Sequence, residues 1–134
     1  MKLSRASSYA LHAIAYMSEN LKKGEPVASH IIAEAQGIPD RFLLKVLKPL
    51  VDVGILTSIK GPNGGYRLAR NVGEISILEI LEAVDGPIRG LVPVRLESNS
   101  GFNKRLDVFC GDTATTMKKH LSRVKLGDLL NGKR

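Results

Sequence analysis

The sequence predicts a mainly α-helical domain that carries one small β-hairpin. Two helix-length apolar stripes are separated by a three-residue turn at 37–39, and a Gly-rich turn at 61–65 joins two short strand-like runs. Two helices joined by a short turn with glycine, followed by a hairpin, are typical of a winged helix-turn-helix. The hairpin taken alone is equally compatible with an ordinary surface turn that carries solvated charges.

The three N-terminal helices are predicted from apolar residues that recur every three or four positions. The first covers residues 5–21, with Ser4 as its N-cap, and the second covers residues 29–36 and ends at Gly37. The third covers residues 40–53. Their inward side chains are expected to include Ile31, Ile32, Ala35, Phe42, Leu43, Val46, Leu47 and Leu50.

The second half of the chain is predicted to hold two further helices and a loop. Ser76 and Glu79 form a capping-box pattern in front of an apolar run, which ends at Gly86. Residues 88–102 are rich in turn formers and are expected to form a mobile loop. A long helix follows over residues 104–123; its narrow apolar stripe packs either on a second copy of the chain or back on the same chain. Residues 126–130 are expected to dock as a short piece, before a frayed tail at 131–134.

The charge of the chain favours a polyanionic partner. The net charge is +7, and residues 1–70 hold ten Lys and Arg against five Asp and Glu. Double-stranded DNA is therefore the expected partner, with an acidic membrane surface as the alternative. No run approaches the roughly 20 apolar residues of a membrane span. The single cysteine, Cys110, is typical of a reducing compartment, so we expect a cytoplasmic location.

The outward face of the third predicted helix carries the residues Arg41, Leu44, Lys45 and Lys48. Such a face can enter a DNA major groove, where Arg and Lys favour guanine edges and phosphates. A merely solvated basic face is the alternative, and the short turn and the hairpin favour the groove. Pro49 removes a backbone donor and clashes with the Lys45 carbonyl. We therefore expect a kink or loosening between these residues, with base reading confined to the N-terminal half of the helix.

Several segments match one family together. The most specific is Lys-Gly-Pro-Asn-Gly-Gly-Tyr at 60–66, and the others are 1–4, 9–11, 32–34, 36–38, 54–56 and 83–86. With these segments the chain resembles the IscR/NsrR/CymR family of bacterial winged helix-turn-helix transcription regulators. The resemblance covers residues 1–87 well and the C-terminal helix loosely. It implies a homodimeric repressor on a palindromic promoter site, with a DNA-binding domain at 1–87, a candidate sensing loop for an unknown effector at 88–102, and a dimerisation helix and tail at 103–134.

The resemblance also implies which residues touch DNA. Arg41, Leu44 and Lys45 would face bases, and Lys60 would reach the minor groove. The remaining members of the implied DNA-binding set are Ser4, Ser7, Tyr9, Lys48, Asn63, Gly64 and Arg67. Some relatives have an acidic residue where this chain has Leu44, which predicts a different operator preference that includes a thymine methyl contact.

The chain departs from the family at the cluster site. Cluster-binding members carry three closely spaced cysteines before the last helix, whereas residues 88–109 contain none and Cys110 lies inside the predicted helix. His120 lies about 15 Å further along that helix. Because an iron–sulfur cluster is usually held by four ligands, we expect no cluster, no other cofactor and no metal. Cys110 is then either a buried structural residue or a redox switch, which would require an exposed thiol of low pKa.

Two other classes of protein remain as alternatives. A winged helix can serve as a protein-interaction module without reading DNA, although the positive charge of residues 1–70 argues against this. An enzyme is the weaker alternative, because the sequence shows no Ser/His/Asp, Cys/His or paired-carboxylate constellation.

Overall fold

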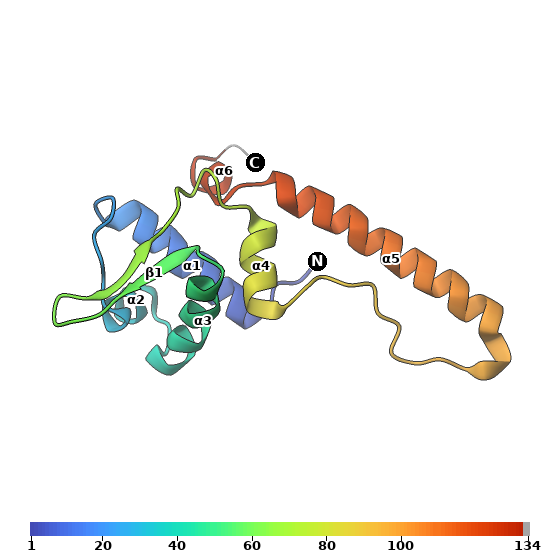
Figure 1. Cartoon of the computed structure of the whole chain (residues 1–134). Helices are drawn as coiled ribbons and strands as arrows, with labels where there is room; N and C mark the ends of the chain where they lie inside the picture. The colour runs from blue at the N-terminus through green and yellow to red at the C-terminus, as the bar shows by residue number, and fades with distance from the viewer. Residues whose placement is uncertain (133–134) are drawn as a thin grey trace.

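The computed structural model describes residues 1–132 and shows a helical body from which one long helix projects (Figure 1). The elements of the body are α1 (Arg5–Asn20), α2 (Ser29–Gln36), α3 (Asp40–Asp52), β1 (Leu56–Ile59), β2 (Gly65–Leu68) and α4 (Ile77–Asp85). A short 3₁₀ turn, η1 (Glu97–Asn99), leads into α5 (Ser100–Arg123), and α6 (Leu126–Leu130) follows. The prediction of a mainly helical winged fold with a long C-terminal helix is confirmed.

The core of the body lies between α1, α3 and α4. Ile14, Leu47 and Ile80, one from each helix, are fully buried there. Burying a side chain of this size contributes roughly 1.5–3 kcal/mol. Ile55, just before the hairpin, is also fully buried and ties the hairpin base to the same core.

Local sequence signals define the helix ends. The Ser4 side chain caps α1 by accepting a hydrogen bond from the Ser7 amide at 3.0 Å. Ser76 and Glu79 form the predicted capping box at the start of α4. Gly37 ends α2 in the left-handed region, with φ of 65°, which glycine adopts without a steric penalty. These predicted caps are confirmed.

Three of the side chains predicted to face inward are exposed instead. The buried side of α2 is centred between Ile32 and Ala33, so Ile31 lies on the far side of the helix and is 43% exposed. Ala35 is exposed for the same reason. Phe42 is 49% exposed, since α3 is oriented by a buried stripe that lies to one side of it, formed by Leu43, Val46, Leu47 and Leu50.

Pro49 does not interrupt α3. The helix is continuous from Asp40 to Asp52, so the predicted loosening is wrong, whereas the kink at Pro49 stays a prediction. Proline removes only one hydrogen bond, the one to the carbonyl of the exposed residue Lys45. Leu47 and Leu50, on either side of the proline, are fully buried and hold both halves of the helix to the core.

The segment between α4 and α5 is irregular, as predicted, but α5 begins at Ser100, inside the predicted loop. Glu82 attaches the segment to α4, because its Oε2 accepts a hydrogen bond from the Ile88 amide at 2.8 Å. Gly90 attaches it to α5: a Cβ on this glycine would lie 2.3 Å from the carbonyl of Cys110. Close backbone approach therefore requires glycine at this crossing.

The C-terminal end of α5 returns to the body. The Ile77 amide donates to the Val124 carbonyl and the Leu126 amide donates to the Ile75 carbonyl, each at 2.9 Å. The predicted docking of residues 126–130 is confirmed, since Leu126 is buried. Of the tail expected to fray, 131–132 form a turn after α6, and 133–134 lie outside the described residues.

Candidate nucleic-acid interface

The turn at Gly37 fixes α3 against α2. The Ile38 amide donates to the Ala33 carbonyl at 2.9 Å, and the Ile38 side chain is buried beneath the turn. Ser29 Oγ, at the first residue of α2, donates to Oδ1 of Asp40, the first residue of α3, at 3.3 Å. The two helices therefore form the predicted helix-turn-helix with a defined angle between them.

The outward face of α3 carries the four predicted residues, and each is exposed: Arg41, Leu44, Lys45 and Lys48. Lys48 pairs with Asp52 at 3.3 Å on the same helix. An exposed pair of this kind contributes only a few tenths of a kcal/mol, so the ammonium group remains available to an anion. The Lys45 Nζ lies 5.9 Å from the ring centre of Phe42.

The hairpin is a two-stranded antiparallel sheet whose tip carries exposed Lys60 and Asn63. Arg67 lies opposite Thr57 in the register and is also exposed. The Gly-rich motif has a steric cause, because a Cβ on Gly64 would lie 2.1 Å from the Ile59 carbonyl oxygen. Any larger residue there would force the tip to move.

The end of β2 that is nearest the tip of the hairpin is joined to the segment between α1 and α2. Val27 and Tyr66 exchange two backbone hydrogen bonds of 2.8 Å. Gly65 makes this possible, since a Cβ at that position would lie 2.2 Å from the Val27 carbonyl oxygen. The hairpin is thus held in a fixed direction relative to the helix-turn-helix, which is what a DNA-contacting wing requires.

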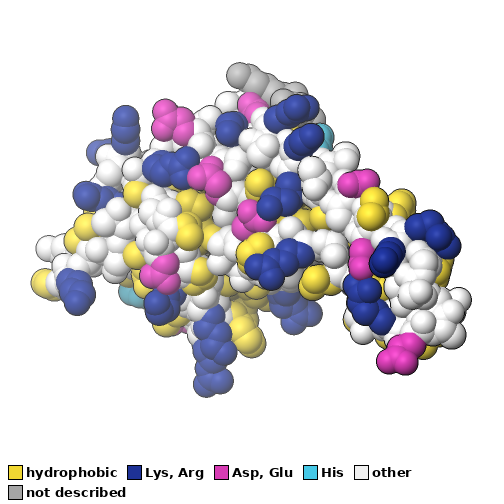
Figure 2. Space-filling model, turned by 45° about the vertical axis from the view of Figure 1, so that its right-hand side comes forward, with side chains coloured by type: hydrophobic (Ala, Val, Ile, Leu, Met, Phe, Trp, Pro, Cys, Tyr) yellow, Lys and Arg dark blue, Asp and Glu magenta, His cyan; other side chains and the backbone are white. Residues whose placement is uncertain are grey.

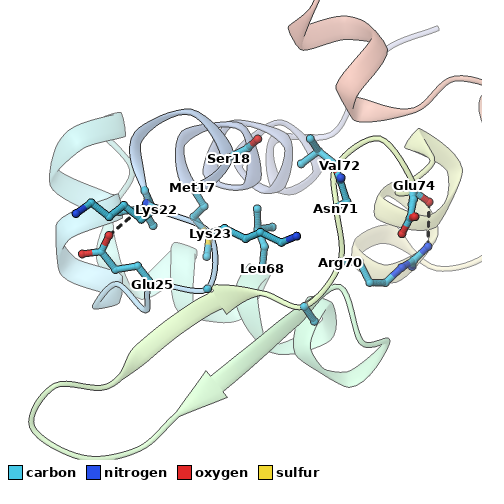
Figure 3. Close-up of a pocket in the computed structure, with 13 residues that line it drawn as sticks. Met17, Ser18, Lys22, Lys23, Glu25, Leu68, Arg70, Asn71, Val72 and Glu74 are labelled. Carbon is cyan, nitrogen blue, oxygen red and sulfur yellow. Dashed lines mark hydrogen bonds between the residues drawn. The ribbon is translucent and has the colours of Figure 1, made fainter.

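Arg70, just after β2, fixes the end of the hairpin. Its guanidinium donates to Glu79 Oε1 at 2.6 Å and to the Glu74 carbonyl at 2.9 Å. The hydrogen bond from Arg70 holds the pKa of Glu79 below its usual value, and Glu79 raises the pKa of Arg70. Figure 3 shows the Arg70 and Glu74 part of this anchor beside an open cavity of about 520 Å³, which is also lined by Lys22 and Lys23 from the segment after α1.

Two of the predicted N-terminal residues are bonded within the protein. Ser7 is fully buried, and its hydroxyl donates to Asp85 Oδ2 at 2.6 Å, so it is not accessible to a DNA phosphate. Its assignment as a DNA contact is corrected accordingly. Ser4 is exposed, but its hydroxyl also donates to Asp85, at 2.7 and 2.8 Å. Tyr9 is half-buried against the core.

Cys110 is half-buried on α5 and lines a cavity of about 230 Å³. Gly90, Phe109 and Met117 line the same cavity. Within residues 1–132, no group of three or more His, Cys, Asp or Glu side chains is placed to hold a metal ion. The lining is mostly apolar around this one thiol and also includes Arg89 and Thr113.

The far half of α5 exposes large apolar side chains. Phe102, Val108 and Phe109 are each more than half exposed, with Phe109 at 66%. Basic side chains are spread over the body and along α5 on the face shown in Figure 2, where acidic side chains are fewer. None of the helices described between residues 1 and 132 is long and apolar enough to cross a bilayer.

A helix-turn-helix with a basic outward face and a rigidly held basic wing defines a DNA-binding transcription regulator. The chain belongs to the Rrf2 family, described as iron-dependent transcriptional regulators, whose sequence model matches residues 3–132. This confirms the resemblance to the IscR and CymR group of regulators.

The relatives agree with this assignment. The regulator IscR of Cronobacter sakazakii is 30% identical over 132 residues, which cover 98% of this chain and 81% of that protein. The structure of CymR, the global cysteine regulator of B. subtilis, matches with a TM-score of 0.72 and 25% identity, over 98% of this chain and 97% of that one. The structure of T. potens IscR matches with a TM-score of 0.68 and 25% identity, over 100% of this chain and 89% of that one.

Proposed function

We propose that this regulator binds a palindromic promoter site as a homodimer and represses transcription in the cytoplasm. The observation that carries the proposal is the placement of exposed cationic groups on α3 and on the wing, two elements that the core and the Val27–Tyr66 bridge hold in fixed relation. A rigid pair of this kind fits adjacent grooves of one duplex.

In the proposed complex α3 lies in the major groove. Arg41, Leu44 and Lys45 then face base edges, and Lys48 reaches a phosphate. The wing lies along the flanking minor groove with the residues Lys60, Asn63, Gly64 and Arg67. Ser4 and Tyr9, near the start of α1, are proposed to lie beside the backbone, and Ser7 is left out because it is buried.

The exposed apolar side of α5 supports the homodimer. Phe102, Val108 and Phe109 present apolar surface that a second copy of the same helix would cover. A two-fold dimer places two copies of α3 on equivalent half-sites, which is why the operator is proposed to be palindromic. An RNA polymerase would be excluded from a promoter so occupied, hence the proposed repression.

The effector is proposed to act on the irregular segment between α4 and α5. This segment joins the DNA-binding body to the proposed dimer helix, and Gly90 in it contacts the α5 backbone at Cys110. A change at this crossing would alter the direction of α5. Cys110 is proposed as a redox-responsive group. The support for this is that its thiol lines the cavity at this crossing.

The test is selection of bound sites from random duplex DNA, followed by binding measurements over a range of salt concentrations. We expect a symmetric consensus and a linear loss of log affinity with log salt, by about 0.9 for each phosphate contacted. Arg41→Ala should cost roughly 1–3 kcal/mol and relax preference at one base pair, whereas Lys60→Ala should weaken all sequences more evenly. Negligible affinity for every duplex at low salt, with salt-independent capture of a protein instead, would favour the interaction-module alternative.

A further inference from the structure

We propose that Phe42 is a positioning residue that directs Lys45 to a guanine in each half-site. The inference rests on the proposed docking of α3 in the major groove. It starts from a finding that the apolar pattern did not predict: Phe42 is not a core residue but lies half-exposed beside the outward face of α3.

The contact between Phe42 and Lys45 is specific. The Lys45 Nζ lies 5.9 Å from the centre of the Phe42 ring, within the range at which an aromatic face attracts an ammonium group. The two residues are three positions apart, a spacing at which helical side chains meet. Among residues 1–132, no carboxylate lies within ion-pair distance of Lys45, whereas Lys48 on the same face is paired with Asp52.

The position of the Phe42 ring determines where on α3 the Lys45 ammonium group is held. Side chains in a helix lean toward its N-terminus, so the Phe42 ring draws Lys45 toward the first turn of α3. This is the end of a recognition helix that contacts base edges in helix-turn-helix proteins. An unrestrained lysine is a flexible point charge suited to phosphate, and restraining it lowers the entropy lost when it binds one acceptor pair. The acceptor pair that a lysine favours in the major groove is N7 and O6 of guanine.

The experiment uses the full chain and the duplex that it selects, with 7-deazaguanine placed at each guanine in turn. This base lacks the N7 acceptor and keeps normal pairing. We expect one guanine in each half-site where the change weakens the wild-type protein severalfold and the Lys45→Met variant not at all. At that guanine alone, Phe42→Leu should reduce the loss of affinity caused by 7-deazaguanine by about two- to fivefold, the range for an exposed cation–π contact.

Phe42→Tyr is the matched control, because it keeps the ring and should keep the full penalty at the same guanine. A second measurement needs no DNA: the ring should shift the Lys45 side-chain methylene protons upfield in the NMR spectrum, and Phe42→Leu should abolish that shift. Three results would each overturn the inference while the proposed function stands. Phe42→Leu could lower affinity equally at every guanine, or leave the affinity lost on 7-deazaguanine substitution unchanged. The Lys45 methylene shifts could also be the same with and without the Phe42 ring. A wild-type protein that selects no duplex would overturn both.

Discussion

The glycine at the wing tip offers the sharpest test of how the wing is built. In Gly64→Ala, the added Cβ would lie 2.1 Å from the Ile59 carbonyl oxygen and 2.9 Å from the Lys60 carbonyl carbon. Both contacts are with backbone atoms, so no side-chain rotation relieves them. The tip must move by about an ångström, and Lys60 and Asn63 move with it because they belong to the same turn.

The expected magnitudes differ for stability and for binding. An overpacked site costs about 1–3 kcal/mol, and a tip that is exposed to solvent should fall at the low end of that range. The loss in DNA binding should be larger, because the shifted wing gives up its phosphate contacts. Each lost contact should lower the slope of log affinity against log salt by about 0.9.

The assay is fluorescence anisotropy with the selected duplex at several salt concentrations, together with urea unfolding. Gly73→Ala is the matched control, since its Cβ would meet only the Asn71 side chain, at an ordinary distance of 3.6 Å. We expect Gly73→Ala to bind as the parent does. A Gly64→Ala protein with parental affinity and parental salt slope would show that the geometry of the tip does not serve DNA contact.

Three further predictions follow from other contacts. Glu79 has a lowered pKa in the folded protein, so its contribution to stability is present above about pH 4.3 and is lost as pH falls through the folded value; Glu79→Gln should flatten the acid limb of the stability curve measured by urea unfolding. Asp85→Ala should cost about 1–3 kcal/mol by leaving the buried Ser7 hydroxyl without its acceptor, while Asp112→Ala, at an exposed position on α5, should cost little. Phe109→Glu should convert the proposed dimer to monomers in sedimentation equilibrium without lowering helix content, and an unchanged mass would contradict the α5 interface.

The features that were predictable from sequence are those encoded within a few residues. Ser4, Gly37 and the Ser76–Glu79 capping box mark helix ends through contacts three or four positions apart, and each is found in the structure. The need for glycine at position 64 is local in the same way, because an added Cβ would meet the backbone of Ile59 and Lys60 in the same hairpin. The need for glycine at position 65 is not local, because the close backbone there is that of Val27.

What the sequence did not predict depends on distant packing. The side on which α2 is buried is set by α1 and α3, so the periodicity of eight residues could not decide that Ile31 is exposed. The partner of Ser7 is Asp85, which lies 78 residues away and carries no local signal. The intrinsic cost of proline in a helix predicts a loosening at Pro49, whereas burial of the leucines on both sides of it keeps α3 continuous.

Because the chain returns to the body after α5, the C-terminal end of this helix is fixed and its N-terminal end projects (Figure 1). Backbone bonds from Ile75 and Ile77 to residues just beyond α5 hold one end, and 24 residues of helix carry the other end about 36 Å outward. In the proposed dimer, the length of α5 determines the distance between the DNA-binding bodies of the two protomers. Inserting or deleting one helical turn in the outer half of α5 would therefore change the spacing between half-sites that the protein tolerates. The sequence preference within each half-site would not change, because α3 is unaltered.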